Sequence, residues 1–175
     1  MNEKTIDLNH IEQYCTLTSA WCSYLSEGAC VCLEKFGHQP GVKLMVECDF
    51  EASFVLNWKK LPPTTIDSWE DLEKAVEFAA YAIALILVWQ LTSYKIVRQA
   101  RRGTKIDYWL GEKSAQNPAQ TKGKLEVSGI LKGSIGQMNF RVKEKSERAK
   151  SAKDKKLTFI VVAEFSRPLV KMIQQ

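Results

Sequence analysis

The chain has 175 residues, of which 45% are hydrophobic and 26% are charged. This length allows one domain with a substantial core, and the composition excludes a disordered or fibrous protein. The net charge of +5 is modest but uneven, because residues 141–156 hold eight Lys and Arg against three acidic residues. Such a segment is either a contact surface for a polyanion or a solvated helix face that runs into a loop.

Residues 1–8 are polar, so no secretory leader is expected. The five cysteines include no CxxC pair, and the only two histidines lie far apart, which argues against a zinc site. The most apolar stretch, residues 78–89, is shorter than the roughly 20 residues that a membrane span needs. The sequence therefore predicts a cytoplasmic protein with reduced cysteines and no membrane segment.

The first third of the chain predicts one helix and one β-structure. Apolar residues recur every three or four positions over residues 8–36, which predicts a helix that stops at the Gly- and Pro-containing segment 37–41. Apolar and polar residues then alternate over 42–58, which indicates strands with one buried face. The alternation is too long for a typical single strand, so it is either a hairpin that turns near 49–51 or one long, bent strand.

The remaining chain predicts a helix, three strands, a helix and a strand. Ser68 is the expected N-cap of the first helix, which is nearly apolar and should be the most buried. The predicted elements are helix 69–93, strands 94–98, 105–110 and 124–131, helix 134–150 and strand 157–165. We expect a single α+β domain over 1–175 with a mixed sheet, in which 68–175 form the core and 1–67 an N-terminal extension.

Two acidic residues stand at particular places in this order. Asp107 lies in Ile-Asp-Tyr-Trp-Leu-Gly on the second predicted strand of the core, and Glu126 lies in Leu-Glu-Val-Ser-Gly on the third. The order of elements, with these acids, resembles the core of the PD-(D/E)xK nuclease superfamily. The resemblance implies a restriction-endonuclease-like αβββαβ core and a Mg²⁺ or Mn²⁺ ion held by Asp107 and Glu126. It also implies hydrolysis of phosphodiester bonds in DNA or RNA.

The sequence departs from the family at one position. The family has a lysine two residues after the strand glutamate, whereas this chain has Ser128. Ser128 should point to the same side as Glu126, because strand side chains alternate. Lysines on neighbouring elements that could replace the missing one are Lys95, Lys105, Lys143 and Lys145. Further acids that could join the site are Glu77 and Glu164.

Two hypotheses follow. In the first, Asp107, Glu126 and Ser128 form the site of a nuclease-like enzyme. Phosphates would then be contacted by a set of basic residues: Arg98, Arg101, Arg102, Lys105, Arg141, Lys143 and Lys145.

In the second hypothesis, catalysis has been lost and the protein is a binding or assembly partner, for example in a bacterial defence or toxin–immunity module. The region 42–58 would then offer a sheet edge to a partner or a second copy.

Each acid also has a simpler interpretation. Asp107 would merely begin a strand after the glycine turn at Gly103. Glu126 would be the solvent-facing member of an alternating strand and would need no metal.

Overall fold

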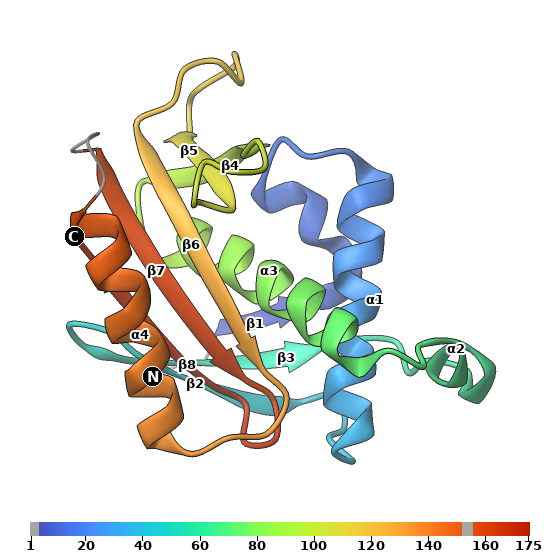
Figure 1. Ribbon diagram of the computed structural model, residues 1–175. Coiled ribbons are helices and arrows are strands. Elements are labelled where there is room, and N and C mark those ends of the chain that lie inside the picture. Colours follow the sequence, from blue (N-terminus) through green and yellow to red (C-terminus); the bar gives the residue numbers. More distant parts are fainter. Residues whose placement is uncertain (1–3, 152–155) are drawn as a thin grey trace.

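The computed structural model describes residues 4–151 and 156–175, so part of the basic segment 141–156 and the first three residues lie outside the described residues. One eight-stranded mixed sheet runs through the molecule in the order β1-β3-β2-β8-β7-β6-β5-β4 (Figure 1). The strands are β1 Lys4–Asp7, β2 Val42–Glu47, β3 Glu51–Asn57, β4 Tyr94–Gln99, β5 Tyr108–Glu112, β6 Gly123–Ile130, β7 Leu157–Glu164 and β8 Leu169–Gln174. The predicted α+β class with a mixed sheet is confirmed.

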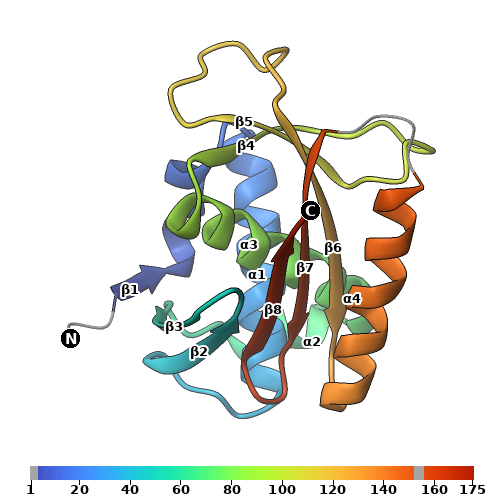
Figure 2. The ribbon, with the colours of Figure 1, turned by 90° about the vertical axis from the view of Figure 1, so that its left-hand side faces the viewer.

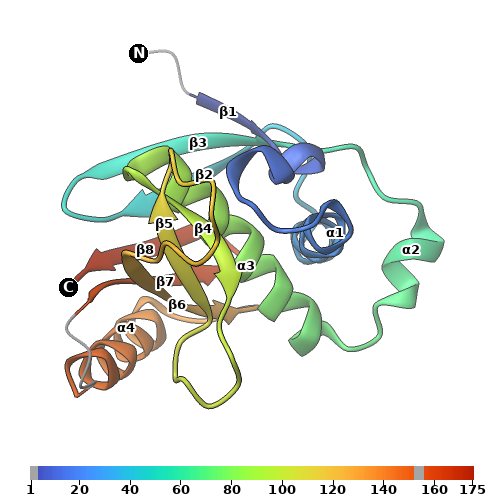
Figure 3. The same ribbon diagram turned by 90° about the horizontal axis from the view of Figure 1, so that it is seen from above.

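The helices lie on both faces of this sheet. They are the 3₁₀ helix η1 Leu8–Tyr14 and the α-helices α1 Ser19–Lys35, α2 Pro63–Ser68, α3 Leu72–Leu91 and α4 Ile135–Lys150. The sheet curls around α3, with α1 alongside that helix (Figure 3). Helix α4 packs against β7 and β6 on the opposite face (Figure 2). In the part of the chain that is described, no helix is both long enough and apolar enough to cross a membrane.

Helix α3 forms the centre of the main core, as its apolar sequence predicts. Eleven of its residues are buried between Ala75 and Val88, against α1 and the concave face of the sheet. The helix starts at Leu72 rather than at residue 69, because Asp71 is the N-cap and accepts a hydrogen bond from the Lys74 N–H. The expected cap Ser68 instead ends the separate short helix α2.

Helix α4 covers a smaller core on the outer face. Met138 is fully buried there against Ile160 and Val162 of β7. Ser134 caps the helix in a capping box with Gln137, which fixes its start where the sequence predicted it. The sheet is therefore buried on both faces at β6 and β7, and polar side chains of these strands that face α4 are removed from solvent.

The N-terminal third differs from the prediction. The single helix over residues 8–36 is wrong: η1 ends at Tyr14, and α1 begins anew after Thr18, whose side chain accepts a hydrogen bond from the Trp21 N–H. The hairpin alternative for 42–58 is correct, since β2 and β3 pair antiparallel. This hairpin is not a sheet edge, because β1 covers β3 and β8 pairs with β2. Strands from 1–67 and from 68–175 thus share one sheet.

Candidate active site

An open cavity of about 670 Å³ lies at the edge of β6, between the N-terminal half of α3 and helix α4. It is referred to below as the first cavity. It exists because β5 leaves β6 early: their pairing ends at Tyr108 opposite Leu125, and the rest of β6 has no strand on that side. At Gly129 the backbone of β6 approaches α3 so closely that a Cβ atom would lie 2.4 Å from the carbonyl oxygen of Val76.

Asp107 occupies the point where β5 and β6 separate. It precedes β5 by one residue, and its Oδ2 accepts a hydrogen bond from the Val127 N–H at 2.7 Å. Its Oδ1 lies 3.1 Å from the hydroxyl oxygen of Tyr81 on α3. The carboxylate therefore satisfies the first unpaired N–H of the open edge of β6 and also lines the first cavity.

Tyr81 connects Asp107 to a second carboxylate. Its hydroxyl oxygen is also 3.0 Å from Oε1 of Glu77, one turn earlier on α3. Burial, followed by the negative charges of Asp107 and Glu77, raises the pKa of the Tyr81 hydroxyl above its ordinary value, so the proton is retained. The Tyr81 hydroxyl can donate its proton to only one of the two carboxylates at a time, so the other carboxylate needs water or a cation as its partner.

Glu126 is buried on the face of β6 that carries α4, and only 4% of it is exposed. Its Oε2 accepts a hydrogen bond from Nζ of Lys145 at 2.7 Å. Burial raises the pKa of Glu126 above its ordinary value; the hydrogen bond and charge of Lys145 oppose this shift, and the charge of Asp107 adds to it. The interpretation of Glu126 as a solvent-facing residue is therefore wrong.

Ser128 lies two residues further along the same face and is also buried. Its hydroxyl accepts a hydrogen bond from Nη1 of Arg141 at 3.0 Å. Helix α4 thus brings two positive charges, on Lys145 and Arg141, against Glu126 and Ser128 of β6.

Only one of the four lysines considered from the sequence reaches Glu126. Lys145 does so, whereas the side chain of Lys143 is 77% exposed and lies 4.0 Å from Glu147. Lys95 is buried in β4, and Lys105 is exposed in the turn before β5. Neither of these two lines the first cavity.

A second cavity, of about 280 Å³, adjoins the first. The two share Glu77, Tyr81 and Asp107 as lining residues, and the second extends toward Arg101 and Arg102 in the turn between β4 and β5. Carboxylates therefore lie at the junction, and basic side chains lie in the parts of both cavities beyond it.

The expected phosphate-contacting residues divide into two groups. Arg101, Arg102, Arg141 and Lys145 line one of the two cavities. Arg98, Lys105 and Lys143 line neither; the guanidinium of Arg98 instead lies 5.7 Å from the ring centre of Trp109.

The sequence interpretation missed one basic residue of the first cavity, Lys132, and included Arg148 only as a member of the basic segment 141–156. A signal for Arg148 was present, because Arg141, Lys145 and Arg148 are spaced by four and three residues and so share one face of α4.

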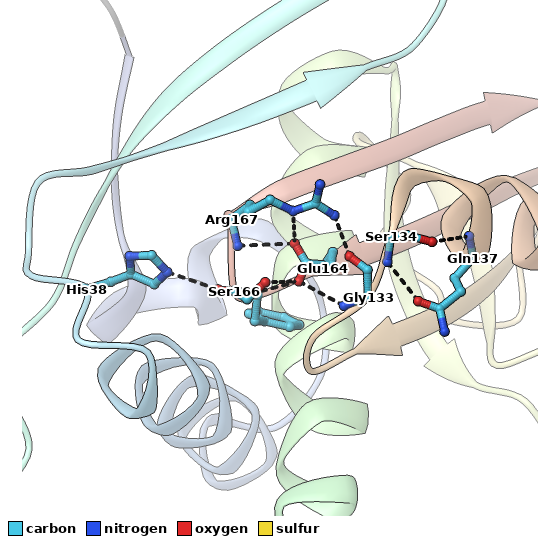
Figure 4. A network of polar contacts seen from close by, with 8 residues as sticks. His38, Gly133, Ser134, Gln137, Glu164, Ser166 and Arg167 are labelled. Atoms are coloured by element: carbon cyan, nitrogen blue, oxygen red, sulfur yellow. Dashed lines mark hydrogen bonds and ion pairs between the residues drawn. The ribbon is translucent and has the colours of Figure 1, made fainter.

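Glu164 does not join this site. It is 1% exposed, and its oxygens accept hydrogen bonds from the N–H groups of Gly133, Ser166 and Arg167 and from the Ser166 hydroxyl and the Arg167 guanidinium (Figure 4). His38 is hydrogen-bonded nearby to the carbonyl oxygen of Phe165. The network ties the loop before α4 to the turn between β7 and β8, so the side chain of Glu164 is occupied in a structural role.

The junction of the two cavities offers carboxylate oxygens, the type of ligand that Mg²⁺ prefers. In the described ranges 4–151 and 156–175, no three His, Cys, Asp or Glu side chains converge in a way that holds a metal ion. Mg²⁺, however, is commonly held by one or two carboxylates, with waters and substrate phosphates as the remaining ligands. Asp107 supplies one such carboxylate at the junction, whereas Glu126 lines neither cavity and is buried against Lys145.

Comparisons with protein families, with curated proteins and with solved structures found no match to this chain.

Proposed function

We propose that the protein is a nuclease-like phosphodiesterase that acts on DNA or RNA with Mg²⁺ or Mn²⁺ at the junction of the two cavities. The observation that carries the proposal is that Asp107 lines an open cavity into which α4 projects Lys145 and Arg141, while Glu126 lies buried on the adjoining strand β6, paired with Lys145. Lys145 would replace the lysine of the E-x-K pattern from a different element.

The charges of the first cavity support a metal-dependent site. Its lining holds four acidic side chains, Glu73, Glu77, Asp107 and Glu144, and four basic ones, Lys132, Arg141, Lys145 and Arg148. The two sets balance in number, but the acids at the junction are Glu77 and Asp107, and a cation bound there would offset their repulsion of a phosphodiester. A divalent ion therefore fits both the acids and the substrate.

The chain's own groups have separate roles in this proposal. Asp107 and Glu126 would hold the metal, which would supply an activated water and stabilise the negative charge that develops on the phosphorus oxygens. Lys145 would orient that water from Nζ, and the Arg141 guanidinium would donate to a phosphate oxygen. Tyr81 keeps Asp107 in position through its hydroxyl.

The test is cleavage of end-labelled single-stranded and duplex oligonucleotides in Mn²⁺ and in Mg²⁺. We expect metal-dependent cleavage that falls by about 100-fold or more in Lys145→Ala, the size typical of the loss of one positioned donor in an active site. Asp107→Asn and Glu126→Gln should be as strongly impaired. Lys143→Ala is the matched control, because it removes an exposed lysine from the same helix.

A metal titration by calorimetry makes the test independent of the substrate chosen. Saturable Mn²⁺ binding should disappear in the Asp107→Asn/Glu126→Gln double variant. Wild-type protein that binds no Mn²⁺, with or without an oligonucleotide, would overturn the proposal.

One observation favours the second candidate, a non-catalytic binding or assembly protein of the same fold. Both oxygens of Asp107 and one oxygen of Glu126 already have protein partners. A partner surface would then be the exposed side chains of the β2–β3 hairpin, Met45 and Phe50, rather than a sheet edge. In that case Asp107→Asn would leave binding intact, whereas a catalyst would lose its activity.

A further inference from the structure

Aromatic side chains form one wall of the second cavity. Trp21 of α1, Phe78 and Tyr81 of α3 and Tyr108 of β5 all line it. Their rings are in contact in series: the centroids are 5.9 Å apart for Trp21 and Phe78, 6.4 Å for Phe78 and Tyr81, and 5.2 Å for Tyr81 and Tyr108. The series continues through Tyr24, which is 41% exposed and lies 4.9 Å from Phe78.

Hydrogen bonds hold three of these rings, those of Trp21, Tyr81 and Tyr108. Nε1 of Trp21 donates to the hydroxyl of Tyr108 at 3.2 Å. The Tyr81 hydroxyl is held between Glu77 and Asp107, at the boundary with the first cavity. The aromatic wall is therefore fixed before any ligand arrives, which lowers the entropic cost of binding to it.

The wall is only partly covered by the rest of the protein. Tyr108 is buried and belongs to the core, but Trp21, Phe78 and Tyr81 are only half-buried and face the cavity. Arg101 and Arg102 lie in the same cavity. Aromatic faces beside guanidinium groups form the combination with which proteins bind unpaired bases and their phosphates.

We propose that the second cavity is a stacking subsite for a nucleobase of single-stranded nucleic acid. The base would lie against Trp21 and Phe78, and Arg101 and Arg102 would contact the adjoining phosphates. This inference rests on the proposed function, because it makes the subsite the neighbour of the phosphodiester that the first cavity would cleave. A base within a duplex has both faces stacked on its neighbours and cannot stack on the protein without being extruded.

The experiment measures oligonucleotide affinity by fluorescence anisotropy with the full chain in EDTA, so that no cleavage is needed. The probes are a short oligothymidylate, its oligouridylate counterpart, the matching duplex and an abasic strand of equal charge. Both single strands should bind more tightly than the duplex and the abasic strand. Trp21→Ala should weaken oligothymidylate binding by about 5- to 150-fold, the range reported for loss of one stacked base.

Two further variants keep the test decisive. Trp21→Leu retains apolar bulk without an aromatic face, so it should lose affinity even if Trp21→Ala folds poorly. Trp109→Ala removes a tryptophan that lines neither cavity and should bind like the wild type. Equal affinity for the thymidine and abasic strands, or an unchanged affinity in Trp21→Leu, would overturn the inference. Base-dependent binding without metal-dependent cleavage would instead overturn only the proposed catalysis.

Discussion

Glu164 shows what a buried acid costs when its partners are removed. The side chain is fully buried, and the three backbone N–H groups that it accepts from have no other acceptor in the network. We expect Glu164→Ala to lower the free energy of unfolding by about 2–4 kcal/mol, since it leaves these donors unsatisfied. Urea titration measures the loss. Glu147→Ala, at an exposed position on α4, should change stability by no more than about 0.5 kcal/mol. A loss below about 1 kcal/mol for Glu164→Ala would contradict the structural role.

Glu126 differs from Glu164 in that its burial is expected to be visible in the pH dependence of stability. Its folded-state pKa is raised, chiefly by burial, above the value of about 4.3 for an unfolded chain. Between these two pKa values the folded state binds more protons than the unfolded state, so stability falls as pH rises through this window. The free energy of unfolding of the wild type, minus that of Glu126→Gln, should therefore decrease from pH 4 to pH 7. Urea unfolding of both proteins at several pH values measures this difference. A difference that increases with pH would refute the prediction.

The sequence could not predict which lysine pairs with Glu126. Asp107 and Glu126 are singled out through the family resemblance, and strand alternation correctly places Ser128 on the same face as Glu126, because alternation is a local property. The choice of Lys145 over Lys143 depends on the rotation of α4 about its axis. That rotation is set by the packing of Met138 against β7, which no local pattern specifies.

At the level of elements, the contact between β6 and α3 permits only glycine. A Cβ atom at Gly129 would meet backbone atoms of Val76, which cannot move aside as a flexible side chain can. Gly129→Ala should therefore cost about 1–3 kcal/mol, the usual range for overpacking. Gly136→Ala is the control: its Cβ would meet only Ser134 Oγ at 3.6 Å, and alanine in a helix should be neutral or stabilising. Chemical denaturation of both variants makes the comparison; equal stabilities would show that β6 can shift away from α3.

The elements that the sequence predicted well are those with long, regular patterns. Helix α4 and the β2–β3 hairpin each carry several repeats of one period, and α3 is a long, nearly uninterrupted apolar run. The errors lie elsewhere. The four residues of β1 are too few to show a period, and the spacing of three or four residues in η1 also fits an α-helix. Strand β8 was missed although it is as long as the predicted β4. The break between η1 and α1 depends on contacts distant in sequence, such as the hydrogen bond from the Thr16 N–H to the carbonyl oxygen of Ile96.

For the whole molecule, the position of the N-terminal hairpin follows from one non-local pairing. Strand β2 joins the sheet parallel to β8, which lies more than 100 residues later in the chain. Local periodicity carries no information on such a pairing, so the sheet order could not be predicted. This pairing places the hairpin on the side of β7 opposite to β6 and so leaves the candidate site at β6 uncovered by it.

The distribution of charge over the two cavities makes a prediction for the whole molecule. If Arg101 and Arg102 contact phosphates of a single strand, each contact releases condensed counterions, and the logarithm of the binding constant falls with the logarithm of salt concentration by about 0.7 per contact. The Arg101→Ala/Arg102→Ala variant should therefore show a slope shallower by about 1.4. Lys105→Ala/Lys143→Ala removes the same charge from positions that line neither cavity and should keep the wild-type slope. Anisotropy titrations of oligothymidylate at several salt concentrations give these slopes. If both double variants change the slope equally, net charge rather than the cavities governs binding, and the phosphate-contacting role of the second cavity is wrong.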